Sequence, residues 1–178
     1  MQHTHGRLEN LLGVLALALA DQMTQATATA AGQGGGAPAA LVQIADHPDL
    51  TIEELRRRIG LTHSAAVRLV DRLAARGLVL RSRDQADART ARLRLTAPGM
   101  TQAEAVLTAR SKAIATIVRR LPPNRRRDLE SLLDEMLMDM PSTSEHGTRL
   151  CRLCCLRDCP ADRCPVELRY QELLSQGR

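Results

Sequence analysis

The sequence predicts a mainly α-helical chain with one small two-stranded β wing. The 178 residues include no Phe, no Trp and one Tyr, so Leu, Ala, Val, Ile and Met must build the core, and this composition favours closely packed helices. Apolar residues also recur at helical spacing through most of the chain. They alternate in a strand-like pattern only between residues 78 and 95.

The N-terminal segment predicts one long and one short helix. The first spans about residues 8–25, and its apolar face is a leucine stripe: Leu8, Leu11, Leu12, Leu15 and Leu19. Residues 24–40 are low in complexity and contain Gly32 and a run of three glycines at 34–36. We therefore predict a Gly/Ala-rich linker over 31–40, with Pro38 near the restart of a short helix over 39–46.

Two short helices joined by a tight turn follow. Thr51 is a good N-cap, and Glu53 and Glu54 stand in the first turn, where the helix dipole favours carboxylates. Gly60 ends this helix, and Thr62 caps a second one that Gly77 ends. The apolar positions of the second helix are Ala66, Leu69, Val70 and Leu73. This spacing predicts a helix-turn-helix.

A hairpin and two further helices complete the predicted fold. Residues 78–81 and 92–95 read as paired strands around a polar tip, which makes a wing. Helices are expected over about 101–120 and 124–140, and a polar linker over 142–148. The fold class is thus a winged helix-turn-helix flanked by long dimerisation helices. Its predicted parts are an N-terminal dimerisation helix (1–30), the linker (31–40), the DNA-binding domain (41–99), C-terminal dimerisation helices (100–141) and a cysteine-rich tail (142–178).

Positive charge is concentrated in the predicted DNA-binding domain. Residues 51–99 hold 11 Arg against 5 Asp and Glu, a net charge of +6 in a chain whose total is +5. A polyanion is the expected partner, although a solvated basic face would show the same charge. The candidate residues for double-stranded DNA are Thr62, His63, Ser64, Ala65, Arg68 and Arg72 on the second helix and Arg81, Arg83, Arg89 and Arg92 in the wing.

This pattern resembles the multiple-antibiotic-resistance regulator (MarR) family. The wing signature of that family has counterparts here in Asp87, Arg89, Leu95, Thr96 and Gly99, and residues 67–73 and 76–79 are similar to its recognition helix and the exit from it. The resemblance is specific over 62–99 and implies a homodimer on a two-fold operator. The leucine-striped helices outside the domain also favour a homodimer, because they carry more apolar area than one small domain can bury.

All five cysteines lie within 14 residues near the C-terminus. Their spacing is C-x2-C-C-x3-C-x4-C, and four thiolates suffice for a closed metal site. The expected ligands are Cys151, Cys154, Cys159 and Cys164, with Cys155 left over. Closely spaced cysteines followed by proline, as at Cys159 and Cys164, favour an iron–sulfur cluster of the 4Fe–4S type. Zinc remains the alternative, and unliganded thiols or a redox disulfide are further ones.

We interpret the chain as a cytoplasmic transcription regulator, with repression the expected mode, whose cysteine cluster senses redox or iron status. Clustered thiols are typical of metal binding where thiols stay reduced. A small-molecule-responsive regulator with structural zinc is the rival interpretation. An enzyme or electron-transfer protein is disfavoured, since the glycine run at 32–36 follows a helix and not a strand. No membrane segment is expected, and the apolar run at 11–20 lacks the basic flank of a signal peptide.

Overall fold

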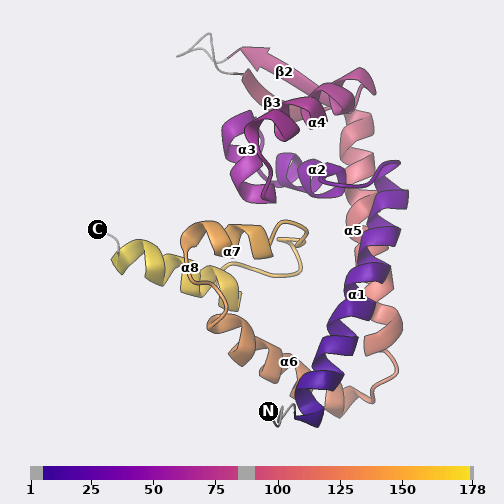
Figure 1. Ribbon diagram of the computed structural model, residues 1–178, viewed down its shortest axis with the longest axis vertical. Coiled ribbons are helices and arrows are strands. Elements are labelled where there is room, and N and C mark those ends of the chain that lie inside the picture. Colours follow the sequence, from indigo (N-terminus) through magenta and orange to yellow (C-terminus); the bar gives the residue numbers. More distant parts are fainter. Residues whose placement is uncertain (1–5, 84–90, 177–178) are drawn as a thin grey trace, which may run out of the picture.

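The computed structural model describes residues 6–83 and 91–176, and its architecture is mainly helical with a three-stranded antiparallel sheet. Two long helices, α1 (Arg7–Ala31) and α5 (Ala97–Val118), lie side by side along the long axis of the molecule (Figure 1). A compact unit of short helices and the sheet sits at one end of this pair. Helix α6 (Pro123–Met138) leaves the other end, so the chain turns back toward the compact unit.

The compact unit contains most of the hydrophobic core. It comprises α2 (Ala37–Asp46), α3 (Ile52–Ile59), α4 (His63–Ala75) and the strands β1 (Leu50–Thr51), β2 (Val79–Arg83) and β3 (Ala91–Leu95). Its largest fully buried side chains include five leucines: Leu41, Leu55, Leu69, Leu73 and Leu93. The predicted fold class, a winged helix-turn-helix with long flanking helices, is confirmed.

The predicted helix boundaries hold best where a polar residue caps the helix. Thr51 forms a capping box with Glu54, since its hydroxyl accepts from the Glu54 amide at 3.1 Å and the Glu54 carboxylate accepts from the Thr51 amide at 2.7 Å. The Thr62 hydroxyl accepts from the amide of Ala65 at 3.3 Å and begins α4. Side-chain caps of this kind are local in sequence, so they can be predicted.

The N-terminal helix is longer than the sequence pattern predicts. The expected end was near residue 25, but α1 continues to Ala31 and closes at Gly32, which has a left-handed φ of 65°. The predicted linker is correspondingly short, because α2 already begins at Ala37 and its first residues are fully buried. The low-complexity Thr/Ala segment is helical because its last turn packs into the core, where Thr27 and Ala31 are buried. Tertiary packing overrides its weak helical signal.

The sheet has one strand more than the predicted hairpin. The predicted pairing of the second and third strands is confirmed, with Val79 opposite Leu95 and Arg81 opposite Leu93. The short strand β1 adds to the other edge of β3, where Leu50 pairs with Leu93. Two residues show no detectable alternation, so the sequence alone gave no signal for this strand. The wing residues Asp87 and Arg89 lie outside the described residues.

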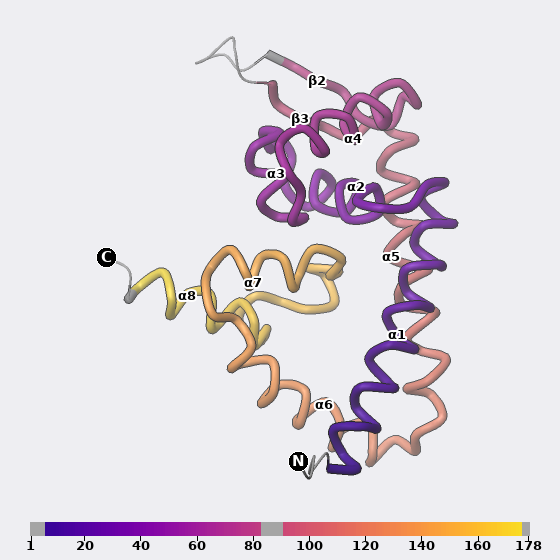
Figure 2. The backbone as a smooth tube through the Cα atoms, in the orientation of Figure 1, coloured from indigo at the N-terminus to yellow at the C-terminus, as the bar shows by residue number. Residues whose placement is uncertain are grey.

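The C-terminal tail folds into two helices that the sequence pattern did not predict. Helix α7 (Ser144–Leu150) begins at the Thr143 cap inside the predicted polar linker over 142–148, and α8 (Pro165–Gln176) follows the last cysteine. Helix α7 packs against α3, and α8 packs against both α6 and α7. Figure 2 shows the tail between the compact unit and α6.

Among the described residues one helix, α1, is long and apolar enough to cross a membrane, judged by length and composition alone. Only 6% of its most apolar stretch is buried in this single chain. A signal sequence or an interface helix of a soluble protein passes the same test. The segment reaches this length because the helix continues to Ala31.

Candidate nucleic-acid interface and cysteine centre

Helix α4 divides its side chains between the core and solvent as a recognition helix requires. Its apolar stripe, Ala66, Leu69, Val70 and Leu73, is buried. The candidate DNA-contacting residues on the other face are exposed: Thr62, His63, Ser64, Arg68 and Arg72. Ala65 is partly buried beside them. The structure therefore brings these six predicted residues onto the outer face of one helix next to the wing, four of them at its N-terminal end.

The N-terminal end of α4 carries a small polar cluster. The hydroxyls of Thr62 and Ser64 lie 3.4 Å apart, and His63 Nδ1 is 3.6 Å from the carboxylate of Glu53 on α3. A hydrogen bond from Arg56 lowers the pKa of Glu53, so this carboxylate stays charged. This end of the helix therefore offers hydroxyls and the histidine ring, the groups that contact base edges or phosphates.

Ion pairs within the domain hold several arginines of the wing. Arg81 binds the Asp71 carboxylate of α4 at 2.7 Å. Arg92 is half-buried and donates a hydrogen bond to the backbone carbonyl of Asp49 at 3.1 Å. Arg94 donates two hydrogen bonds to the Asp49 carboxylate, at 2.5 and 2.6 Å. Arg92 and Arg94 thus tie the strand β3 to the turn before β1. The side chain of Arg83 and all of Arg89 lie outside the described residues.

Sequence reasoning missed two basic features of this domain. Helix α3 presents Arg56, Arg57 and Arg58 in its last turn, on the first helix of the helix-turn-helix. Arg76 donates to the carbonyl of Ala31 at 3.0 Å and so closes the C-terminal end of α1. Arg76 could not be assigned this role from sequence because its partner lies 45 residues away.

The four cysteines predicted as ligands come together in the loop between α7 and α8. The thiols of Cys151 and Cys154 interact with each other, and those of Cys159 and Cys164 form a second interacting pair. Cys151 also interacts electrostatically with both members of the second pair. Cys151 is the C-cap of α7, and Cys164 immediately precedes α8 with its carbonyl accepting from the Leu168 amide at 2.9 Å. The two tail helices therefore fix the ends of the cysteine loop.

Within the first pair the two thiols have different acidities. Their interaction lowers the pKa of Cys154 and raises the pKa of Cys151. Arg110 of α5 also lowers the pKa of Cys154. Burial, together with the Cys164 thiol, raises the pKa of Cys159 to about 11. The loop thus holds one thiol that ionises readily near a cation, and thiolate is the form that binds metals.

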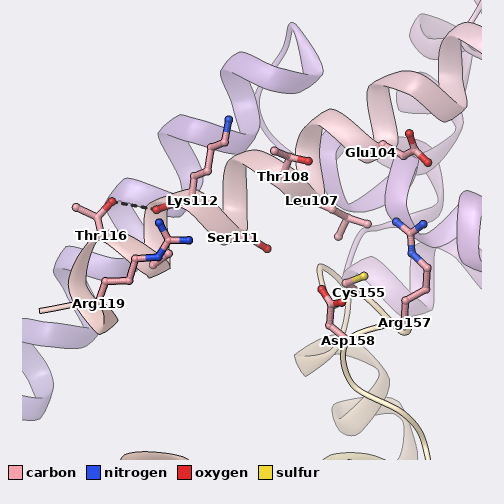
Figure 3. A pocket seen from close by; sticks show the side chains of 11 residues that line it. Glu104, Leu107, Thr108, Ser111, Lys112, Thr116, Arg119, Cys155, Arg157 and Asp158 are labelled. Carbon is pink, nitrogen blue, oxygen red and sulfur yellow. Dashed lines mark hydrogen bonds between the residues drawn. The ribbon is translucent and has the colours of Figure 1, made fainter. Parts of the chain in front are cut away.

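The fifth cysteine lines a groove that none of the other four lines. Cys155 interacts with Arg157, and both residues border this open groove of about 980 Å³ between the tail and α5. Figure 3 shows Cys155, Arg157 and Asp158 facing Glu104, Leu107 and Thr108 of α5. That Cys155 is not one of the four ligands stays a prediction.

The cysteine loop lies against the DNA-binding domain as well as against α5. The side chain of Leu153 packs on the hydrophobic core, and the Arg152 carbonyl accepts from Gln43 Nε2 of α2 at 3.4 Å. The Arg110 Nε atom on α5 is buried without a hydrogen-bond partner in the described structure. The cysteine loop therefore lies at the junction of α5 with the domain.

The described residues form no ready site for a single metal ion. No group of three or more His, Cys, Asp or Glu side chains among them is placed to hold one ion. The buried Arg110 N–H and the N-terminus of α8 would both favour a negatively charged centre in the cysteine loop.

Comparisons with known proteins find one matching family model and several similar solved structures. The family model described as "MarR family" matches residues 36–90. A MarR family protein from Bacillus stearothermophilus superposes with a TM-score of 0.65 and 28% identity over 75% of this chain and 92% of its own. The YusO protein from Bacillus subtilis gives a TM-score of 0.66 and 21% identity over 74% and 93%, respectively.

A third similar structure contains DNA. It is the MarR family protein Rv2887 from Mycobacterium tuberculosis in complex with DNA, with a TM-score of 0.59 and 21% identity over 74% of this chain and 98% of its own. None of the curated proteins matches this chain. The fold of the chain is therefore that of MarR proteins, and the family match covers its helix-turn-helix and the first strand of its wing.

Proposed function

We propose that this chain is a homodimeric, MarR-type, DNA-binding transcription regulator of the cytoplasm that represses its target genes and carries no catalytic activity. The observation that carries the proposal is the outer face of α4, where exposed Thr62, His63, Ser64, Arg68 and Arg72 stand beside a basic wing. Such a helix fits the major groove, and the wing then reaches the adjacent backbone. The structure of Rv2887 with DNA supports the same use of this fold here.

The proposed homodimer rests on apolar surface that the single chain leaves exposed. Leu8, Val14 and Leu17 of α1 are 74, 68 and 69% exposed, and α6 buries none of its residues. An apolar surface of this kind on long helices is typical of an interface. Two copies of the domain would then read a palindromic operator, because protein and site share a two-fold axis.

The dimer can be tested by a charge placed on this surface. Leu133 lies on α6 and is 45% exposed in the single chain. The substitution Leu133→Asp is expected to convert the protein from two chains to one, because a carboxylate cannot be buried unpaired between apolar helices. Light scattering measures the mass directly. A wild-type mass of one chain would contradict the dimer.

We further propose that Cys151, Cys154, Cys159 and Cys164 hold an iron–sulfur cluster of the 4Fe–4S type. The cluster would supply redox- and iron-dependent chemistry to the tail, so operator affinity would follow redox or iron status. Two close thiol pairs, the free N–H of Arg110 and the contacts of the loop with α2 support this. The second candidate is a small-molecule-responsive regulator with zinc in the tail, and the groove of about 980 Å³ beside α5 favours it.

Operator binding is tested by selecting genomic fragments on the immobilised protein and footprinting those retained. On the duplex so found, Arg68→Ala is expected to weaken binding by about 5- to 150-fold, because a bidentate arginine–guanine contact is worth about 1–3 kcal/mol. Lys112→Ala is the charge-matched control, since Lys112 is exposed on α5 away from the interface. Fluorescence anisotropy gives both affinities.

The salt dependence of the affinity for the same duplex is a second test of DNA binding. Each phosphate neutralised by an arginine contributes nearly one unit to the slope of log affinity against log salt. A steep negative slope is therefore expected for the wild-type protein. A flat titration, or equal affinities for Arg68→Ala and the wild type, would remove the assignment of α4 as the reading helix.

A further inference from the structure

The two residues between Cys151 and Cys154 are both held by the DNA-binding domain. The backbone carbonyl of Arg152 accepts a hydrogen bond from Gln43 on α2, 109 residues earlier in the chain. The side chain of Leu153 packs against the hydrophobic core of the same domain. The conformation of this four-residue segment therefore decides whether the two contacts form.

Gln43 is a buried polar side chain in an otherwise apolar stretch. It is 4% exposed, and the rest of α2 from Ala37 to Ile44 is buried and without side-chain polar atoms. Its Oε1 accepts from Arg58 Nη1 at 3.3 Å, and its Nε2 donates to the Arg152 carbonyl at 3.4 Å. A guanidinium only donates, so the amide oxygen must face Arg58 and the amide nitrogen must face the loop. Both ends of the buried amide are thereby satisfied.

Arg58 extends this link into the helix-turn-helix. It lies in the last turn of α3, the helix that precedes the turn to α4. The same helix packs against α7, whose C-cap is Cys151. Helix α7 thus holds the first end of the cysteine loop against α3, and the amide of Gln43 links the inside of the loop to the same helix.

We propose that Gln43 is a positioning residue that transmits the occupancy of the cysteine centre to α3 and thereby sets the orientation of α4 toward DNA. The inference rests on the proposed function, because it names how that function is regulated. A centre bound by Cys151 and Cys154 fixes the loop that carries the Arg152 carbonyl. Without the centre the loop gains conformational freedom, and the hydrogen bond to Gln43 then costs the entropy of ordering it.

The coupling is measured as a ratio of two affinities. The operator duplex found by footprinting is titrated with protein that retains its centre and with protein from which a chelator has removed it, both under anaerobic reducing conditions. For the wild type, the two dissociation constants are expected to differ by about tenfold, within the usual range of coupling between sites. Gln43→Met keeps the length and packing of the side chain but makes neither hydrogen bond, and its ratio is expected to fall below about twofold.

A second glutamine provides a matched control. Gln102 on α5 donates from Nε2 to the carbonyl of Ala30 at 3.0 Å, so it also joins two distant segments through a backbone carbonyl. Its partner lies on α1 and not in the tail. Gln102→Met is therefore expected to keep the tenfold ratio even if it lowers overall stability.

The outcomes separate the transmission through Gln43 (the relay) from the proposed function. A wild-type ratio near one overturns the proposed sensing and the relay together. A wild-type ratio near ten that persists in Gln43→Met overturns the relay alone. If Gln43→Met does not fold, Arg58→Gln removes the guanidinium from the same link and is judged by the same ratio.

Hydrogen exchange gives a readout that a merely structural role would not move. In the wild type the backbone amides of α3 are expected to exchange faster after the centre is removed. In Gln43→Met they should exchange equally in both forms, while the metal content per chain stays that of the wild type. Centre-dependent protection of α3 that survives in Gln43→Met would contradict the proposal.

Discussion

Replacing Cys154 with serine is expected to abolish the metal centre, whereas Cys155→Ser is expected to leave it in place. The two cysteines are adjacent in sequence, but the Cys154 thiol interacts with Cys151 and with Arg110. Cys155 lies beside Arg157 in the groove at α5. A serine hydroxyl does not ionise near neutral pH and is a poor ligand for iron or zinc, so one substitution within a four-thiolate set removes the centre.

The measurement is the content of iron, acid-labile sulfide and zinc per chain after anaerobic purification. Iron and sulfide in the wild type and in Cys155→Ser, with both lost in Cys154→Ser, is the expected pattern for a cluster. One zinc per chain without sulfide would favour the alternative of a structural zinc site. Retention of the centre by Cys154→Ser together with its loss in Cys155→Ser would overturn the ligand assignment.

The same pair of variants separates the centre from the groove. In Cys154→Ser the loop loses its constraint, so operator affinity is expected to change to that of chelator-treated wild type. Cys155→Ser changes only a residue that lines the groove. Its operator affinity should therefore equal that of the wild type, unless a small molecule bound in the groove regulates DNA binding. An altered affinity in Cys155→Ser alone would favour the small-molecule alternative.

The features that the sequence predicted correctly are those encoded over a few residues. The caps at Thr51 and Thr62, the stop at Gly60 and the alternation of residues 92–95 each depend on neighbours within about one helical turn or one hairpin. The outer face of α4 followed from its apolar stripe, because burying one face of a helix exposes the other.

The features that could not be predicted from the sequence depend on contacts between distant segments. Strand β1 is two residues long and exists because β3 offers a free edge. Helix α7 is one of the shortest in the chain and is stabilised by packing on α3 and α8, since an isolated helix of that length is marginal in water. Gln43, Arg110 and Arg76 gained their roles from partners that no local pattern could indicate.

The substitution Gly99→Ala is expected to destabilise the protein by about 3 kcal/mol, the upper part of the range for overpacked sites. Gly99 is buried in the first turn of α5, and a Cβ there would stand 2.1 Å from the backbone oxygen of Leu78 and 3.2 Å from the Leu95 Cβ. The Leu78 oxygen cannot withdraw freely, because it accepts from the Thr96 amide at 3.0 Å. Relief therefore requires that α5 move away from the wing, which also breaks the bond from the Thr96 hydroxyl to the Gly77 carbonyl.

A second buried helical glycine makes the prediction specific to this contact. A Cβ at Gly147 in α7 would meet Pro141, Val166 and Tyr170 at 3.7–3.8 Å, which is ordinary van der Waals contact. Gly147→Ala is therefore expected to be neutral or to stabilise by up to about 1 kcal/mol, because alanine loses less backbone entropy in a helix. Urea unfolding at one fixed protein concentration compares the two variants. Equal destabilisation by both would show that burial of a glycine, and not its distance from the Leu78 carbonyl, decides the effect; opposite signs would tie the start of α5 to the wing through this contact.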